Sequence, residues 1–192
     1  MSIYVVSGYM RSGTSMMMDA LTAGGLNPAF NETRNYMNNR WGDDSYKPNP
    51  NGFYELSHEE YKQDGFPGQY EGKLLKILWS GLPKMIVNDY KVVFMKRDPE
   101  EIRQSYEAFF KIKHRDKFND WYKKKMQETI DLLHYRKDTE SLIMDYRYVV
   151  DNPYDAFNQL KKNGWDIDCN LAAQKIDPKL HRFKIEHLTV GI

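Results

Sequence analysis

The chain has 192 residues, of which 41% are apolar and 29% charged, the balance of a soluble globular protein. Its 28 Lys and Arg residues against 27 Asp and Glu leave a net charge of +1, which gives no support for general nucleic-acid binding. The single cysteine, Cys169, excludes an internal disulfide. No apolar run approaches the length of a membrane span, and no signal-peptide pattern opens the chain. We therefore expect one cytoplasmic domain over residues 1–192, with neither a nucleic acid nor a membrane as partner.

The first predicted element is a strand over residues 3–8, which leads through a short loop into a helix over about 12–23. A β-branched and aromatic run favours the strand, and a pair of glycines is expected to end the helix. In such a strand–loop–helix unit, backbone N–H groups and the helix N-terminus face an anion. Gly8 and Gly13 have the Walker A spacing, but Thr14 stands where that motif has its lysine.

This loop offers an anion both charge and hydrogen bonds. Arg11 supplies a fixed positive charge, and the helix N-terminus adds roughly half an elementary charge. Gly13 could admit a close ligand, and the hydroxyls of Ser12, Thr14 and Ser15 can each donate a hydrogen bond. A tight turn without a ligand would also favour Gly, Ser and Thr. The combination of these residues with Arg11 favours a phosphate-binding loop.

Periodicity disappears over residues 27–52, where Asn, Asp, Pro and Gly dominate. A loop of this length in a compact domain is typically functional or disordered. We expect a loop or lid here that determines which ligand binds, because Tyr36, Trp41 and Tyr46 could stack on a sugar or an aromatic ring. A short helix is expected afterwards, over 58–62.

Strands and helices alternate through the rest of the chain. Strands are expected over 73–79, 91–96 and 141–146, and helices from Pro99 onward and over 116–136, 154–162 and 171–175. The strand over 91–96 is apolar without alternation, which is typical of a central parallel strand covered on both faces. The sequence therefore predicts an α/β fold of three layers, with a mainly parallel sheet flanked by helices. Ligands of such folds lie beyond the carboxyl ends of the strands.

Arg97 ends one of these strands, and Ser105 lies two turns into the following helix, which Asp98 can cap. A strand-end arginine is often the ion-pair partner of a nearby carboxylate, and Asp98 or Glu101 could be that partner here. Beside the phosphate-binding loop, however, Arg97 and Ser105 offer a second anion site at the same edge of the sheet. Two phosphate sites suggest a nucleotide that is phosphorylated at both ends.

These segments resemble the sulfotransferase family that uses 3′-phosphoadenosine 5′-phosphosulfate (PAPS), in its compact bacterial branch. Residues 7–15 resemble its 5′-phosphosulfate loop, and residues 96–99 with Ser105 resemble its 3′-phosphate motif. Residues 145–153 are similar to its Tyr-Glu-Asp-Leu strand and following helix. Three further segments look like parts of the bacterial branch: 49–55, 75–78 and 176–182. The resemblance touches most of the chain and implies a P-loop NTPase-like architecture.

The resemblance implies that the sulfuryl group of PAPS moves in line to an acceptor hydroxyl or amine, leaving adenosine 3′,5′-bisphosphate. Positioning and charge stabilisation carry most of such a transfer. No metal is needed if Arg11 and Lys76 neutralise the leaving phosphate. The implied acceptor is a small molecule, a carbohydrate or a peptide. The residues implied to bind PAPS are Arg11, Ser12, Gly13, Thr14, Ser15, Arg97, Ser105, Tyr146 near the adenine, and Arg182.

The chain departs from the animal cytosolic members of this family at two points. Leu78 stands where they have a histidine base, and their C-terminal Arg-Lys-Gly motif is absent, so His181 with Arg182 could replace it. The resemblance favours Glu55 as general base, since the family places a glutamate after an Asn-Pro-x-Gly-aromatic segment. Glu32 is the rival, because residues 31–34 resemble the base segment of tyrosylprotein sulfotransferases; His58 ranks third.

Two other functions stay open at this point. A P-loop nucleotide or small-molecule kinase fits the glycine spacing, but the Walker lysine is missing and no clear Walker B carboxylate follows. A non-catalytic protein that kept a nucleotide pocket is the other alternative. The sequence leaves the oligomeric state open.

Overall fold

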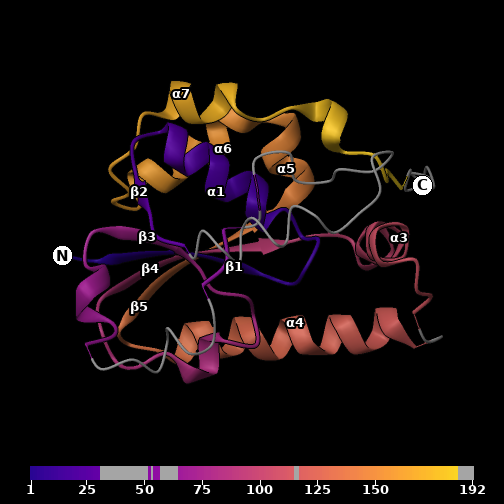
Figure 1. The fold of residues 1–192 in the computed structure, drawn as a ribbon, viewed down its shortest axis with the longest axis horizontal. Coiled ribbons are helices and arrows are strands. Elements are labelled where there is room, and N and C mark those ends of the chain that lie inside the picture. The colour runs from indigo at the N-terminus through magenta and orange to yellow at the C-terminus, as the bar shows by residue number, and fades with distance from the viewer. Residues whose placement is uncertain (31–51, 53, 57–64, 115–116, 186–192) are drawn as a thin grey trace, which may run out of the picture.

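The structure is a computed structural model that describes residues 1–30, 52, 54–56, 65–114 and 117–185 (Figure 1). Within these residues, parallel strands form one five-stranded sheet in the order β2-β3-β1-β4-β5. The strands are β1 (Ile3–Gly8), β2 (Asn27–Pro28), β3 (Lys73–Lys76), β4 (Tyr90–Lys96) and β5 (Thr139–Asp145). β1 lies at the centre, with β3 and β4 as its neighbours, and its residue Val6 is in register with Lys76 on one side and Val93 on the other.

Helices cover both faces of the sheet (Figure 1). On one face lie α1 (Thr14–Ala23), α5 (Tyr146–Asp151), α6 (Pro153–Lys162) and α7 (Cys169–Gln174), and on the other lies α4 (Phe118–Tyr135). Each face has its own apolar core, because alternate strand residues point to opposite sides. Val6 and Val93 pack with α1, α5 and α6, whereas Val5 and Val92 pack with α4. The predicted three-layer α/β fold, with a parallel sheet flanked by helices, is confirmed.

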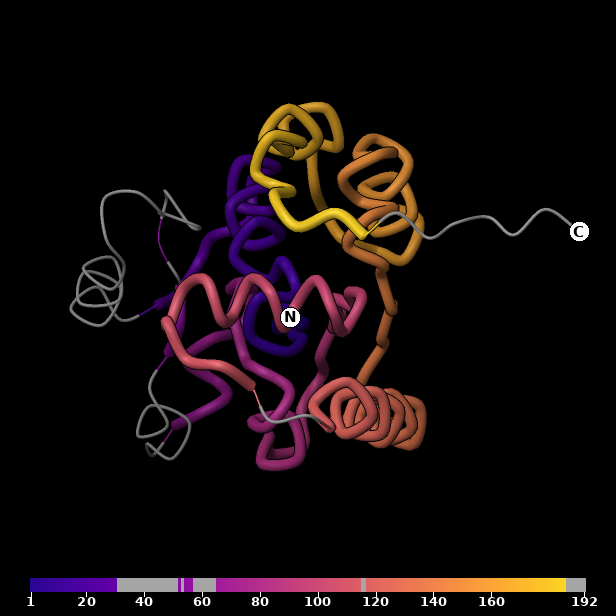
Figure 2. Tube along the Cα trace, turned by 90° about the vertical axis from the view of Figure 1, so that its right-hand side faces the viewer, coloured from indigo at the N-terminus to yellow at the C-terminus, as the bar shows by residue number. Residues whose placement is uncertain are grey.

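The helix α3 (Pro99–Phe110) lies at the carboxyl end of the strands, separate from both layers. Asp98 begins this helix as predicted, since its carboxylate accepts hydrogen bonds from the backbone N–H groups of Glu100 and Glu101. Figure 2 looks onto this end of the sheet, where α3 crosses in front of the strands and the last described part of the chain runs beside it. The ligand-binding edge expected for a parallel sheet therefore lies between α3 and that last segment.

The structure differs from the sequence prediction at three elements. The expected loop over 27–52 begins with β2, which extends the sheet beside β3. The strand predicted over 73–79 ends at Lys76. Tyr146, expected at the end of a strand, is instead the first residue of α5, and Asp145 caps that helix by accepting from the N–H groups of Arg147 and Tyr148.

Some expectations fall on residues that the structure does not describe. The helix over 58–62 and most of the loop up to residue 52 lie outside the described residues, as do Glu32, Tyr36, Trp41, Tyr46 and His58. Within the described ranges, none of the helices combines the length and the apolar character needed to span a bilayer.

Candidate functional site

A cavity of about 300 Å³ opens at the carboxyl ends of β1, β3 and β4. Its wall combines the loop after β1, the start of α1, α3, the start of α5 and the segment that follows α7. Of the predicted site residues within the described ranges, all but Ser12 and His181 line this cavity: Arg11, Gly13, Thr14, Ser15, Glu55, Lys76, Arg97, Ser105, Tyr146 and Arg182. The fold thus brings together residues that come from distant parts of the sequence.

The loop after β1 is tied to the end of β4 and to α3. Arg97 Nη1 donates a 3.0 Å hydrogen bond to the backbone carbonyl of Arg11, and Arg11 Nε donates a 3.1 Å hydrogen bond to Ser105 Oγ. The Arg11 guanidinium also lies 5.4 Å from the ring centre of Phe109. Arg11 has φ 70, a left-handed backbone conformation that is uncommon outside glycine. The two anion sites expected from the sequence are therefore in direct contact.

Gly13 lies under the ring of Tyr146, where no side chain fits. Its backbone is left-handed with φ 99, and a Cβ atom here would lie 2.4 Å from Tyr146 Cδ2. α1 starts at the next residue, so the N–H groups of its first turn, which have no partner within the helix, belong to residues that line the cavity. Ser12 is fully buried beneath the loop against Gly8, and its hydroxyl has no partner among the described residues.

Lys76 brings a buried cation to the start of α1. Its ammonium group donates a 3.0 Å hydrogen bond to Ser15 Oγ and lies 3.4 Å from Glu55 Oε1. The Lys76 side chain is 3% exposed and the Glu55 side chain 17% exposed. This arrangement places a carboxylate, a cation and a hydroxyl side by side in the cavity.

Tyr54, the residue before Glu55, is anchored on α1. Its hydroxyl donates a 3.3 Å hydrogen bond to Asp19 Oδ1, and its ring packs edge-on against Phe30. Burial, together with the nearby carboxylate of Asp19, raises the pKa of Tyr54 to about 12, so the hydroxyl stays protonated and can donate. Tyr54 has φ 56, the left-handed conformation again. These contacts fix the backbone from which Glu55 reaches Lys76.

Arg97 forms the ion pair that was the alternative to phosphate binding. Its Nε donates a 2.9 Å hydrogen bond to Glu101 Oε2, and its guanidinium lies 4.2 Å from the ring centre of Tyr146. Arg97 nevertheless lines the cavity, and within the described part of the chain its Nη2 group has no hydrogen-bond partner. Arg97 thus combines a structural ion pair with N–H groups that a ligand can still use.

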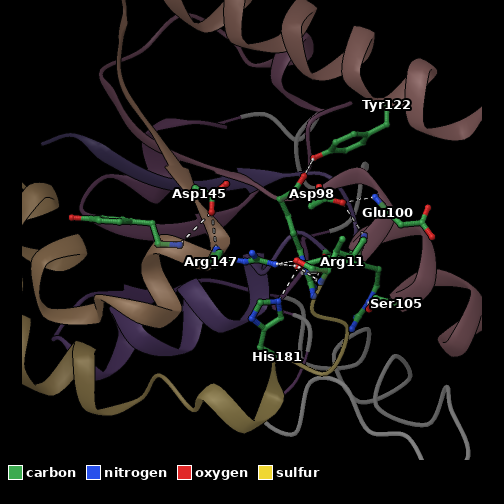
Figure 3. A network of polar contacts seen from close by, with 12 residues as sticks. Arg11, Asp98, Glu100, Ser105, Tyr122, Asp145, Arg147 and His181 are labelled. Carbon is green, nitrogen blue, oxygen red and sulfur yellow. Dashed lines mark hydrogen bonds and ion pairs between the residues drawn. The ribbon is translucent and has the colours of Figure 1, made fainter. Parts of the chain in front are cut away.

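Glu101 is the common partner of Arg97, Arg147 and His181, and the sequence predicted only its pairing with Arg97. Figure 3 shows two of these partners, Arg147 and His181, pointing toward one another. Glu101 accepts a 2.7 Å hydrogen bond from Arg147 Nη2 and lies 2.8 Å from His181 Nε2. Burial alone would raise the pKa of Glu101, but the hydrogen bonds from Arg97, His181 and Arg147 lower it to about 2. The sequence indicated only one part of this network. Arg97 and Glu101 are four residues apart where a helix is predicted to start, a spacing that allows an ion pair.

His181 and Arg182, expected together at the 3′-phosphate, separate in the structure. The buried ring of His181 contacts Glu101 and meets the ring of Tyr146 edge-on, with 4.9 Å between ring centres. Arg182, in contrast, lines the cavity. His181 therefore belongs to the support of the site, and Arg182 to its surface.

Apolar side chains also line the cavity, among them Met10, Met16, Leu78, Phe109 and Phe110. No three His, Cys, Asp or Glu side chains within the described ranges are grouped so that they could hold a metal ion. The lining thus combines charged and apolar side chains, and Phe109 lies beside the guanidinium of Arg11.

No protein-family model matches the chain, and no curated protein matches it. A comparison with solved structures matches the chain to an unliganded crystal structure of a sugar kinase from Janibacter sp.. It shares 13% sequence identity, over 93% of this chain and 97% of that chain, with a TM-score of 0.38. A likeness of this size carries no argument about activity, so the function has to be inferred from the cavity itself.

Proposed function

We propose that this chain is a PAPS-dependent sulfotransferase, which transfers a sulfuryl group to a hydroxyl or amine of a small-molecule, carbohydrate or peptide acceptor. The observation that carries the proposal is the contact between Glu55, Lys76 and Ser15 beside the start of α1. A carboxylate that can accept a proton and a cation that can stabilise a leaving phosphate lie next to each other there.

The charge of the cavity supports an anionic nucleotide. Cationic side chains outnumber anionic ones among the lining residues, with Arg11, Lys76, Arg97, Lys175 and Arg182 against Asp19, Glu55 and Asp177. Lys76 binds Ser15 at the start of α1, and Arg97 and Arg182 line the same cavity from the end of β4 and from the segment after α7. In the proposal, a nucleotide with phosphate at both its 5′ and its 3′ position uses cations from these separate elements.

PAPS supplies an activated sulfuryl group on its 5′-phosphate when it is bound. In the proposal, Glu55 accepts the proton of the acceptor hydroxyl, while Lys76 and Arg11 neutralise the charge that develops on the 5′-phosphate. Arg97, Ser105 and Arg182 hold the 3′-phosphate. Gly13, Thr14 and Ser15 contribute backbone N–H groups at the start of α1, where an anion is stabilised by the helix dipole. The N–H of Ser12 donates to the carbonyl of Tyr9 instead, so Ser12 supports the loop from beneath.

The P-loop kinase is the competing function, and the position of the cation argues against it. A Walker A loop carries its lysine within the motif, but here that position is Thr14, and the buried ammonium group comes from Lys76 at the end of β3. The cation is therefore arranged differently from that of a kinase that reaches the β- and γ-phosphates of ATP with its loop lysine.

A comparison of ligands by thermal unfolding tests the proposal, because a ligand that binds only the folded chain stabilises it by mass action. Adenosine 3′,5′-bisphosphate should raise the midpoint temperature more than adenosine 5′-monophosphate or ATP with Mg²⁺. The largest shift with ATP and Mg²⁺ would instead favour the kinase, and no shift with the bisphosphate would contradict the proposal. Binding of the bisphosphate without transfer from PAPS to any member of a broad acceptor panel would indicate the non-catalytic alternative.

A further inference from the structure

Glu101 is a buried carboxylate that donors from three separate parts of the chain surround. Arg97 comes from just after β4, Arg147 from α5 and His181 from the segment after α7. Figure 3 shows Arg147 and His181 approaching from these two elements. A fourth contact, of 3.4 Å, comes from the backbone N–H of Ile185. The residue is 1% exposed and does not line the cavity. Glu101 therefore cannot act by touching a ligand, and its contacts indicate what it holds in place.

One group of these contacts fixes a wall of the cavity. Residues 174–183, named here the C-terminal wall, supply Gln174, Lys175, Asp177, Leu180, Arg182 and Phe183 to the lining. Within and just after this wall, His181 lies 2.8 Å from Glu101, and Arg147 Nη2 donates a 2.7 Å hydrogen bond to the carbonyl of Ile185. The wall is thus attached to α3 and α5 through Glu101 and its partner Arg147.

The other contact fixes the direction of Arg97. Its Nε is bonded to Glu101 and its Nη1 to the carbonyl of Arg11, so the plane of the guanidinium is set by two acceptors. Because the fork of an arginine is rigid, holding these two groups also fixes where Nη2 points. The same carboxylate therefore sets the positions of Arg97 and of the wall that carries Arg182.

We propose that Glu101 is a positioning residue that holds Arg97 and the C-terminal wall together as one binding site for the 3′-phosphate. The identity of the ligand in this assignment rests on the proposed function. The contact between Glu101 and the wall does not, because it is a property of the chain without ligand.

The sign of the effect separates positioning from simple electrostatics. Removing a negative charge beside an anion site strengthens anion binding if charge alone matters. Removing a residue that orients the cations weakens it. Glu101→Gln keeps the size of the side chain but replaces one acceptor oxygen with an amide that faces donors. If Glu101 has a positioning role, this variant should therefore bind the bisphosphate more weakly, even though the loss of a negative charge makes its site more positive.

The test is a calorimetric titration of adenosine 3′,5′-bisphosphate and adenosine 5′-monophosphate into the full chain and its Glu101→Gln variant. We expect the variant to lose about tenfold to a hundredfold in affinity for the bisphosphate, the loss for a disturbed hydrogen bond to a charged group, and much less for the monophosphate. Glu100→Gln is the matched control, because Glu100 pairs with Arg103 and Asn119 and does not line the cavity. This variant should leave both affinities unchanged.

Hydrogen exchange of the protein without ligand provides the second measurement. Backbone amides over 178–185 should exchange faster in Glu101→Gln than in the unmodified chain or in Glu100→Gln. His181→Asn, which removes one contact of the wall but leaves the pair of Arg97 and Glu101, should show the same faster exchange with a smaller loss of affinity. This second variant keeps the test decisive if Glu101→Gln does not fold.

The outcomes distinguish the positioning role from the proposed function. If the unmodified chain does not prefer the bisphosphate to the monophosphate, the proposed function fails, and hydrogen exchange alone then decides whether Glu101 holds the wall. If the unmodified chain shows that preference but Glu101→Gln binds the bisphosphate equally well or more tightly, the positioning role is wrong. Equal losses for both nucleotides, or unchanged exchange over 178–185, would also overturn it.

Discussion

The ammonium group of Lys76 lies 3.4 Å from the carboxylate of Glu55 in the cavity at the carboxyl end of the sheet. The two residues reach this point from different directions, Lys76 from the end of β3 and Glu55 from a segment that Tyr54 anchors on α1. Because Lys76 also binds Ser15, the pair is held beside the loop where an anion is expected. This relationship leads to the first two predictions.

Glu55→Gln should lower the turnover of PAPS by roughly 10²–10⁴, the contribution typical of a positioned general base. The amide keeps the size of the side chain and its contact with Lys76, so the affinity for adenosine 3′,5′-bisphosphate should hardly change. Steady-state kinetics and calorimetry on the same preparations measure the two effects. Glu32→Gln serves as the comparison, since near-normal turnover in Glu55→Gln together with an inactive Glu32→Gln would reverse the assignment of the base.

Lys76→Met should weaken the binding of adenosine 3′,5′-bisphosphate by about 1.5–3 kcal/mol, because it removes a charged donor while filling the same buried space. Ser15→Ala removes only the hydroxyl that contacts Lys76, so it should weaken the binding of the bisphosphate by less. Both affinities can be measured by calorimetry. An unchanged affinity in Lys76→Met would show that this cation serves the fold rather than the ligand.

Arg97→Lys should weaken binding of the same bisphosphate by about 1.5–3 kcal/mol, since lysine cannot copy the fork of an arginine. Adenosine 5′-monophosphate lacks the 3′-phosphate, so its affinity should change much less. The contact between Arg97 and the carbonyl of Arg11 makes this comparison essential, because loss of that contact alone would disturb the loop for both nucleotides. Equal losses would mean that Arg97 supports the loop, and the 3′-phosphate assignment would be wrong.

Gly13→Ala should lower the free energy of unfolding by more than a left-handed backbone conformation alone would cost an alanine. That conformation costs an L-residue about 1–2 kcal/mol, and the added Cβ would also lie 2.4 Å from the ring of Tyr146. Gly25→Ala is the matched control, because Gly25 has a similar φ of 107 with nothing within 4 Å of the added atom. Urea unfolding should show a larger loss in the free energy of unfolding for Gly13→Ala than for Gly25→Ala. Equal losses in the two variants would contradict the close packing of Tyr146 on the loop.

The stability of the chain should depend on pH through Glu101, whose pKa is lowered from 4.5 to about 2. Burial acts against this shift, and the hydrogen bonds from Arg97, His181 and Arg147 outweigh it. Because the pKa is lower in the folded state, the ionised carboxylate contributes stability that is complete above about pH 4.5 and is lost as the pH falls towards about 2. In urea unfolding, the unmodified chain should therefore have a higher free energy of unfolding than Glu101→Gln above about pH 4.5. The gap between the two free energies should narrow as the pH falls towards about 2. A difference independent of pH would mean that Glu101 is not held in its ionised form.

The parts of the fold that depend on local pattern could be predicted from the sequence. β1 and β4 each contain a continuous apolar run of four residues, and Asp98 with Pro99 marks the start of α3, so these elements were predicted close to their observed bounds. β2 could not be predicted because it has two residues at the edge of the sheet, too few to show any alternation. α5 was missed although Asp145 is a good helix cap, because the apolar residues before it extended the predicted strand.

The surface of the candidate site was predicted better than its support. Arg11, Lys76, Arg97 and Ser105 were chosen from motifs, and the fold brings them to one cavity. The role of Glu101 depends on Arg147 and His181, which are distant in the sequence and belong to no motif with it. Such long-range pairing follows from the path of the chain over the sheet, which local patterns do not contain.

The most direct test of the proposed function is transfer from PAPS labelled with radioactive sulfur, measured over a panel of alcohols, phenols, amines, sugars and peptides. ATP labelled at its γ-phosphate is tested in parallel with Mg²⁺ and the same panel. A sulfotransferase should move the sulfur label to at least one acceptor, release adenosine 3′,5′-bisphosphate in equal amount, and leave the γ-phosphate on ATP. Transfer of the γ-phosphate, with the sulfur label remaining on PAPS, would contradict the proposal.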